Sequence, residues 1–178
     1  MTATEQPEHT RKNVLLVPLA FLSLLLSGAI FGFFYAWTCS TMWGLDAADP
    51  KVAIAAMQAM NASVRNPVFA PAFFGTPFVL LATAALAWFA TRRRSALFFA
   101  LAGLVYLFGG MVLTFAVNVQ MNEALALVTI PESTEEARQI WQAYSAPWQA
   151  WNITRTIVSG VSLLLTGAAF LTLRRDNG

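Results

Sequence analysis

Four apolar runs, almost free of charge, alternate with shorter polar segments along the chain. They cover residues 14–37, 68–90, 95–117 and 153–173, and Arg155 is the single charged residue within them. Each run has 21–24 residues, so as a helix it spans about 31–36 Å, enough to cross a hydrocarbon core of ~30 Å. The apolar residues are continuous and do not alternate with polar ones, which favours helices over barrel strands. The pattern predicts an all-α membrane protein with a four-transmembrane-helix bundle.

Positive charge is concentrated on one side of these runs. Seven of the eleven Lys and Arg residues fall there: Arg11, Lys12, Arg92, Arg93, Arg94, Arg174 and Arg175. The opposite side carries Lys51, Arg65 and Arg138, with Arg155 at its border. Lys and Arg collect on the cytoplasmic side of membrane proteins. We therefore predict a multi-pass protein of the cell membrane with cytoplasmic termini. Residues 14–173 form its single domain, between flexible cytoplasmic tails at residues 1–13 and 174–178.

The two connections on the outer side, residues 38–67 and 118–152, are too long to be simple turns. Asp49 followed by Pro50 is typical of a helix N-terminus, because an Asp side chain caps free N–H groups and proline suits the first turn. The segment Ser-Thr-Glu-Glu at residues 133–136 is typical of a capping box. The helix that it opens is predicted to continue through a proline into the fourth run. The outer side therefore carries a small helical cap.

Composition supports the membrane prediction and excludes several kinds of chemistry. Hydrophobic residues make up 57% of the chain and charged residues 11%, with a mean hydropathy of +0.58; soluble domains have about 45–50% and 25%. The basic residues are dispersed between apolar runs, so we predict membrane lipid and no nucleic acid as partner. One cysteine, Cys39, and one histidine, His9, cannot form an intramolecular disulfide, a thiolate cage or a histidine-based metal or heme site. No metal and no cofactor is predicted.

Polar side chains inside the apolar runs are costly, and here they form two stripes. In the predicted last helix, which includes the fourth run, residues recur at spacings of three, four or seven, which places them on one helical face. They are Trp141, Trp148, Asn152, Arg155, Ser159, Ser162 and Thr166. In the third run, residues recur every four positions: Tyr106, Gly110, Thr114, Asn118 and Asn122. We predict that both stripes face the interior of the bundle.

Arg155, Asn152, Asn118 and Asn122 are predicted to meet near the outer membrane surface, and two interpretations remain open. In the first, they form a binding pocket whose cationic and amide groups suit an anionic or carbonyl-bearing ligand. In the second, Arg155 extends to the interface and the amides make a structural network. Glu123 is the only acidic residue adjacent to this cluster.

Further residues are candidates for contact with the ligand. Tyr35, Thr76 and Asn61 can join the cluster from the first two runs and the first outer connection. The aromatic residues expected around it are Phe34, Tyr35, Phe73, Phe74, Trp148 and Trp151. Such a lining suits a planar aromatic or quinone-like small molecule.

Several short motifs occur in an order that resembles a known family. They are FYAW at residues 34–37, AMQAMN at 56–61, NPVF at 66–69, FGTP at 74–77, TFAVNVQMNEAL at 114–125 and WQAWNITRT at 148–156. The ordered set resembles the family of small four-span membrane proteins that includes the anthrone oxygenases. The resemblance implies a four-helix membrane bundle. By analogy with characterised members, it also implies oxygen-dependent conversion of an anthrone to an anthraquinone.

The resemblance further implies which residues carry the function. The matching positions, from the motifs N-V-x-x-N and W-N-x-x-R-T, are Asn118, Asn122, Trp151, Asn152, Arg155 and Thr156. Two positions depart from the family pattern. Gln120 stands where a proline is expected, and Ile153 stands where many relatives carry histidine. A role of that histidine in proton transfer or metal binding does not carry over to this chain.

Two functions of different class are compatible with these residues. The first is a cofactor-independent oxygenase that oxidises an anthrone-like aromatic ketone to a quinone with O2. In it, Arg155 and the amides of Asn118, Asn122 or Asn152 stabilise an oxyanion, and Glu123 or a water removes the proton. The second is a non-enzymatic membrane binder or assembly subunit for a lipid or quinone-like molecule, which needs the pocket but no base. A coupled transporter is disfavoured, because the apolar runs contain no acidic residue.

Overall fold

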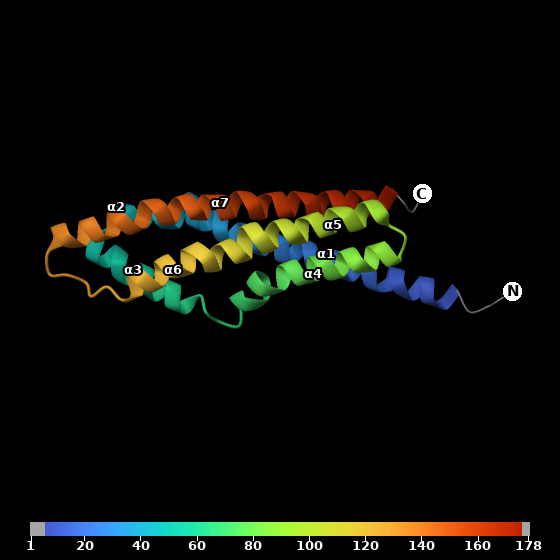
Figure 1. The fold of residues 1–178 in the computed structure, drawn as a ribbon, viewed down its shortest axis with the longest axis horizontal. Helices are drawn as coiled ribbons and strands as arrows, with labels where there is room; N and C mark the ends of the chain where they lie inside the picture. Colours follow the sequence, from blue (N-terminus) through green and yellow to red (C-terminus); the bar gives the residue numbers. More distant parts are fainter. Residues whose placement is uncertain (1–5, 176–178) are drawn as a thin grey trace.

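The computed structural model describes residues 6–175, and the side-chain surroundings of residues 15–173. All regular elements in this part of the chain are helices. Four helical stretches are long and apolar enough to cross a membrane: Leu15–Ala47, Phe69–Phe89, Arg93–Ala126 and Thr134–Leu173. They form an elongated bundle (Figure 1). The predicted all-α bundle is confirmed, and its four apolar helices indicate a multi-pass membrane protein.

The first spanning helix is longer than its apolar run. α1 (Gln6–Ala36) begins within the segment predicted as a flexible tail, of which residues 1–5 lie outside the described part. It continues through a π-helical turn, η1 (Trp37–Thr41), into α2 (Met42–Ala47). The helix ends where Ala48 becomes extended. Asp49 precedes a proline and therefore avoids the helical region, so this pair of residues ends one helix and begins the next.

The third spanning helix also continues beyond its apolar run. α5 (Arg93–Tyr106) leads through two π-helical turns, η2 (Leu107–Val112) and η3 (Thr114–Asn118), into α6 (Val119–Ala126). The outer connection that was predicted to begin at residue 118 therefore begins only after Ala126. A π-helical turn carries an extra residue, which shifts the face that the following residues present.

The spanning helices pack as a closed ring. α1 contacts α4 (Phe69–Phe89) and α7 (Thr134–Arg175), and α5 contacts the same two helices from the other side. Hydroxyl groups join neighbouring helices in this ring: Ser23 Oγ lies 2.9 Å from Thr83 Oγ1, and Ser162 Oγ donates to a carbonyl of α5 at 2.9 Å. Small polar residues of this kind stabilise helix pairs in membranes.

The predicted helical cap is present at the outer end. The Asp49 side chain accepts a hydrogen bond from the Lys51 N–H at 2.9 Å and so caps α3 (Pro50–Ser63). The Ser133 hydroxyl accepts from the Glu136 N–H at 3.3 Å at the start of α7. Both predicted helix starts are confirmed. α7 then runs unbroken through its internal proline into the membrane-spanning segment.

A single carboxylate fastens α2 to α7. Asp46 accepts hydrogen bonds from Trp141 Nε1 at 2.9 Å, Ser145 Oγ at 2.6 Å and Gln149 Nε2 at 2.8 Å. Next to these bonds, α2, α3 and α7 share an apolar core that includes Met42, Ile54, Met57, Trp141, Tyr144 and Trp148. The cap is therefore a packed part of the fold, built on the same helix that carries Arg155.

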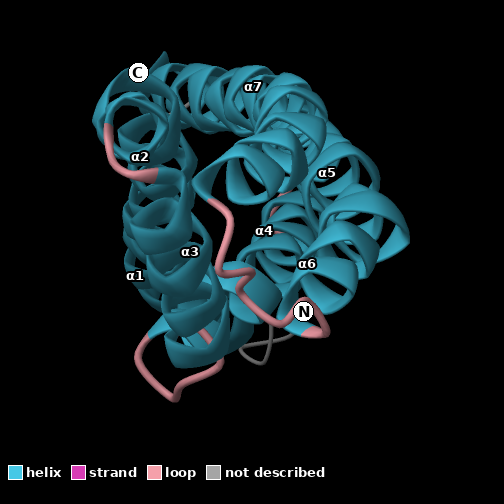
Figure 2. Cartoon of the chain, turned by 90° about the vertical axis from the view of Figure 1, so that its left-hand side faces the viewer, coloured by secondary structure: helices cyan, strands magenta, loops and turns pink. Residues whose placement is uncertain are grey.

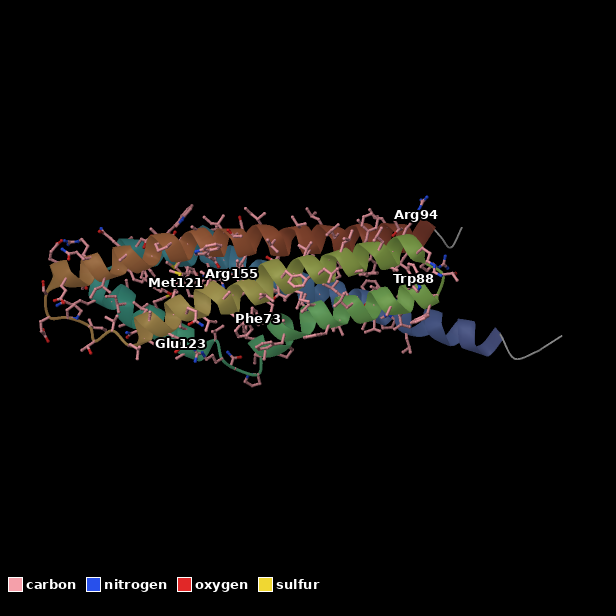
Figure 3. All side chains as sticks on the ribbon, in the orientation of Figure 1. Phe73, Trp88, Arg94, Met121, Glu123 and Arg155 are labelled. Atoms are coloured by element: carbon pink, nitrogen blue, oxygen red, sulfur yellow. The ribbon has the colours of Figure 1, made fainter. Side chains whose placement is uncertain are left out.

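The two ends of the bundle differ in character. The chain enters and leaves at one end, where Arg94 also lies, and α2, α3 and α6 lie at the other (Figures 1 and 3). Figure 2 views the bundle from this second end and shows helices joined by short loops. At the first end the Arg93 guanidinium lies 3.6 Å from the centre of the Trp88 ring. That this end faces the cytoplasm stays a prediction from the distribution of charge.

Candidate functional site

A cavity of about 590 Å³ lies in the outer half of the bundle. Residues of all four spanning helices line it, together with α3 and the loop that follows α3. Aromatic rings form most of its walls. The polar side chains that face it are Asn61, Arg65, Asn66, Thr114, Asn122, Glu123 and Arg155. Aromatic walls with a few polar groups, at this volume, are typical of a small-molecule site.

Arg155 is a buried cation at the wall of this cavity. Its side chain is 5% exposed, and its guanidinium carbon lies 4.6 Å from the Phe34 ring centre and 5.2 Å from that of Trp148. Nη2 donates to Asn152 Oδ1 at 2.9 Å, and Nη1 donates to Thr114 Oγ1 at 3.3 Å. Among the side chains that the structure describes, no carboxylate pairs with it. The rings and the two oxygens compensate part of its lost hydration, but no negative charge does.

Asn152 holds this guanidinium in place and does not line the cavity. It is fully buried, and its Nδ2 donates to the Phe34 carbonyl at 3.0 Å and to Thr38 Oγ1 at 2.9 Å. A carbonyl can only accept, so Nδ2 is fixed on that side and Oδ1 is turned toward Arg155. Thr38 belongs to the π-helical turn η1 and also lies 3.0 Å from Thr156 Oγ1. Asn152 thus holds the position of a residue that orients Arg155, and its contact with a ligand stays a prediction.

Asn122 is a second polar group whose orientation is fixed. Its Oδ1 accepts from the Tyr144 hydroxyl at 2.8 Å and from Trp148 Nε1 at 2.9 Å. Asn61 also belongs to this group, since its Nδ2 donates to the Tyr144 hydroxyl at 3.4 Å. Because Oδ1 of Asn122 already accepts two hydrogen bonds, its Nδ2 is the group that remains to donate to a ligand in the cavity. Asn61, Asn122 and Trp148 all line the cavity, as predicted.

Glu123 lies at the outer rim of the cavity, where Figure 3 shows it farther toward the cap than Arg155. Its carboxylate pairs with Arg65 of the loop after α3. Both side chains are about half exposed, at 51% and 62%, so the pair contributes little to stability. The Glu123 carboxylate therefore lies at the cavity wall but forms an ion pair with the Arg65 guanidinium. Arg65 was not singled out in the sequence, because an isolated arginine in a polar loop carries no distinctive signal.

The aromatic wall contains more rings than the sequence suggested. Four of the expected rings line it: Phe34, Phe73, Phe74 and Trp148. Four others also line it: Phe33, Trp37, Phe69 and Phe115. The rings contact one another across helices, with centres 4.6 Å apart for Phe33 and Phe69 and 5.2 Å for Trp37 and Trp148. In a segment that is apolar on every side, hydrophobicity does not reveal which face a ring occupies.

Three predicted contact residues lie outside the cavity. Tyr35 is 51% exposed and stacks on Phe31, and Trp151 is 39% exposed on the surface of α7. Neighbouring helical residues point about 100° apart, so Tyr35 faces outward because Phe34 beside it faces the cavity. Thr76 is fully buried, and its hydroxyl donates to the Ala72 carbonyl of its own helix.

Asn118 is buried in the protein and also does not line the cavity. Neither its Nδ2 nor its Oδ1 has a hydrogen-bond partner in the described part of the chain, and the same holds for Arg155 Nε. A buried polar atom without a partner costs about 1–3 kcal/mol. The structure thus places Asn118 outside the cavity lining and without a hydrogen bond to the described residues, and its contact with a ligand stays a prediction.

The two departures from the expected family pattern both lie away from the cavity. Ile153 is 44% exposed on the outer surface of α7, and Gln120 is exposed on α6. Neither residue lines the cavity. The loss of a histidine at position 153 therefore leaves the polar groups around Arg155 unchanged.

Together the cavity presents N–H donors inside an aromatic enclosure. Arg155 and Asn122 both offer them, and both are held by buried partners. Donors in this arrangement suit an oxygen that carries, or develops, negative charge, and aromatic walls suit flat rings.

Comparison with known protein families identifies a matching family. The sequence model of the family described as anthrone oxygenase matches residues 67–165, which is more than half of the chain. Comparison with curated proteins and with solved structures gives no match. The matched region begins just before α4, includes the third spanning helix, and reaches into α7 beyond Arg155. The chain therefore belongs to the anthrone oxygenase family.

Proposed function

We propose that this protein catalyses the O2-dependent oxidation of an anthrone-like aromatic ketone to a quinone. In this proposal the ketone lies between the aromatic walls with its carbonyl oxygen toward Arg155 and Asn122. Membership of the family supports the reaction class. The cavity supports the shape of the substrate, because eight aromatic rings line it and Arg155 and Asn122 present N–H donors to it.

The observation that carries the proposal is the uncompensated charge of Arg155. The guanidinium is 5% exposed and pairs with no carboxylate among the described side chains. A buried cation of this kind is costly to the fold, and a substrate oxyanion supplies the missing negative charge. Preorganised donors accelerate a reaction when charge develops near them, since they need no reorganisation.

The reaction balances with O2 as the only co-reactant. Loss of a proton from the methylene carbon of an anthrone leaves an enolate, whose negative charge rests on the carbonyl oxygen near Arg155. The enolate reduces O2, a C–O bond forms at the former methylene carbon, and the proton returns to give a hydroperoxide. Loss of water from the hydroperoxide forms the second carbonyl. One anthrone and one O2 thus give one anthraquinone and one water.

Glu123 is the candidate for the base, because it is the carboxylate that lines the cavity. Its ion pair with Arg65 must open, or a water must relay the proton, before it can act. Both groups are half exposed, so opening the pair is inexpensive. In this proposal oxyanion stabilisation contributes more to the rate than the base does.

The test is the oxidation of anthrone by purified protein in detergent, followed by O2 uptake and by absorbance of the quinone. We expect Arg155→Met to lower the rate by about 10²–10³, the usual effect of removing one oxyanion donor. Glu123→Gln should lower it less. Arg138→Met is the matched control, because Arg138 is half exposed on α7 and pairs with Glu135. A chelator should leave the rate unchanged, since no cluster of metal-ligating side chains occurs in the described chain.

Three results would change the proposal. A larger effect of Glu123→Gln than of Arg155→Met makes proton removal the dominant contribution. Oxidation at the protein-free rate, with a melting temperature raised by anthrone, leaves a binder without catalysis. Absence of both oxidation and binding refutes the proposal for this substrate class.

A further inference from the structure

The cavity approaches the outside of the protein at two places. One is the polar rim near the cap, where Arg65, Asn66 and Glu123 are exposed. The other is the side of the bundle between α4 and the third spanning helix. There Phe74 and Phe115 both line the cavity, and each is 46% exposed. These two half-exposed rings therefore bound the cavity on this side.

The backbone is open behind these two rings. α4 packs closely along α5, yet no Cα of α4 lies within 8 Å of a Cα in η3 or α6. The helices therefore separate toward the outer end, and phenyl rings close the space between them. The ring centres of Phe73 and Phe115 are 6.0 Å apart, those of Phe74 and Phe115 are 6.0 Å apart, and those of Phe73 and Phe74 are 5.0 Å apart.

The surface outside this phenyl group is apolar and belongs to the membrane-spanning segments. Phe78 follows Phe74 by one turn of α4 and is 60% exposed, and Phe108 and Val112 of the third helix are 63% and 46% exposed. Exposed apolar side chains on a spanning helix contact lipid. Phe74 and Phe115 thus continue this exposed apolar surface, whereas Phe73 is the buried member of the group and lines the cavity.

The phenyl group is also suited to open. Phe74 and Phe115 are the members suited to move, because each is 46% exposed and exposed side chains change rotamer within nanoseconds. Phe73 is 4% exposed and packs in a buried cluster with Phe34 and Tyr106, so it forms the fixed inner edge of the group. At the polar rim, by contrast, the ion pair between Arg65 and Glu123 connects the loop after α3 to α6. A flat apolar molecule partitions from water into the bilayer, so it meets the phenyl group and not the charged rim.

We propose that the ligand enters the cavity sideways from the membrane, through a gate formed by Phe73, Phe74 and Phe115. The partner of this surface is the outer part of the bilayer, and the ligand class is an uncharged, lipid-dissolved aromatic molecule. The inference rests on the proposed binding of such a molecule in this cavity, but it does not require that the molecule is oxidised.

The experiment measures access to the cavity without any reaction of the substrate. In a Cys39→Ser background, Thr114→Cys places one thiol in the cavity beside Arg155. The protein is reconstituted in phosphatidylcholine vesicles. The labelling rate of that thiol is measured with a pyrene maleimide, which dissolves in the bilayer, and with a sulfonated maleimide, which stays in water. Phe115→Ala widens the gate and Phe115→Trp narrows it; Phe78→Ala is the matched control, because Phe78 faces lipid and does not line the cavity.

We expect Phe115→Ala to raise the pyrene maleimide rate about fivefold, roughly the factor that one aromatic pair contributes, and Phe115→Trp to lower it. The sulfonated reagent should be unaffected by both, and Phe78→Ala should change neither rate. Phe74→Ala is the second variant if Phe115→Ala does not fold. The proposal is overturned if the ligand site is reached from water. In that case the sulfonated maleimide labels the thiol faster than the pyrene maleimide does, and Arg65→Ala raises the rate of the sulfonated reagent. The variants at Phe115 and Phe74 then leave the pyrene maleimide rate unchanged. An inactive protein with a working gate refutes only the proposed oxidation.

Discussion

Arg155→Lys and Arg155→Met form a pair of substitutions that tests whether the charge of Arg155 is buried. Lysine keeps the charge but has a single ammonium group in place of the planar guanidinium. All three of its N–H donors sit on one nitrogen, so it does not reproduce the two separate positions, Nη1 and Nη2, that bond Thr114 and Asn152. Methionine is shorter than arginine, removes the charge and leaves an apolar side chain beside Phe34 and Trp148, whose rings flank the guanidinium.

The magnitudes follow from the two hydrogen bonds. A bond to a charged group contributes about 1.5–3 kcal/mol, and the 3.3 Å contact with Thr114 is long and falls at the lower end. Ammonium is also more strongly hydrated than guanidinium, so we expect Arg155→Lys to cost about 2–4 kcal/mol. Arg155→Met leaves Asn152 Oδ1 buried without a donor, which costs about 1–3 kcal/mol. It also removes a buried charge whose desolvation costs several kcal/mol, so the Arg155→Met variant should be at least as stable as the Arg155→Lys variant.

The assay is thermal unfolding in detergent, followed by tryptophan fluorescence. For a chain of this size ~1 kcal/mol changes Tm by about 2–4 °C, so Arg155→Lys should lower Tm by about 4–16 °C. Arg138→Lys is the control and should leave Tm unchanged, because Arg138 is half exposed and its ion pair with Glu135 is weak. A silent Arg155→Lys together with a strongly destabilised Arg155→Met would show that the guanidinium reaches water. That result would refute the buried charge on which the proposed function rests.

Three further predictions concern other parts of the molecule. Asn118→Leu removes two buried atoms that have no partner, so it should raise the free energy of unfolding by about 1–2 kcal/mol in denaturant titration; a loss of stability would contradict the unpartnered geometry. Asp46→Ala removes three hydrogen bonds between α2 and α7 and should lower that free energy by about 1–3 kcal/mol, whereas an unchanged Tm would mean that the apolar core alone holds the cap. Reporters active only in the cytoplasm, fused at Arg93 and at the C-terminus, should both give signal; signal from only one would make the orientation wrong.

The sequence alone determined the fold class, because the features that decide it are local in the chain. The length and continuity of the four apolar runs require helices that cross a membrane, whatever their neighbours are. The same holds for the caps at Asp49 and Ser133, where a side chain bonds a backbone N–H two or three residues away. Helix ends in the outer part were predicted less well. The third helix continues to Ala126 because Leu125 is buried in the apolar core of the cap and Asn122 accepts hydrogen bonds from α7, contacts that local hydropathy does not report.

The residues of the candidate site were likewise predicted only in part from the sequence. Of the predicted cluster, Arg155 and Asn122 line one cavity together with Glu123, Asn61 and Trp148, whereas Asn118 and Asn152 do not line it. A charged or amide group in an apolar run stands out in a sequence because lipid cannot solvate it.

Only the tertiary structure decided how each of these groups is used. It turned Asn152 toward Phe34 and Thr38, and so made it a support for Arg155. It also selected which of the many rings face the cavity, since a helix that is apolar all round gives no sign of its inner face. Those choices depend on π-helical turns and on contacts between helices far apart in the chain. Such contacts form only when the bundle packs, so no stretch of sequence encodes them by itself.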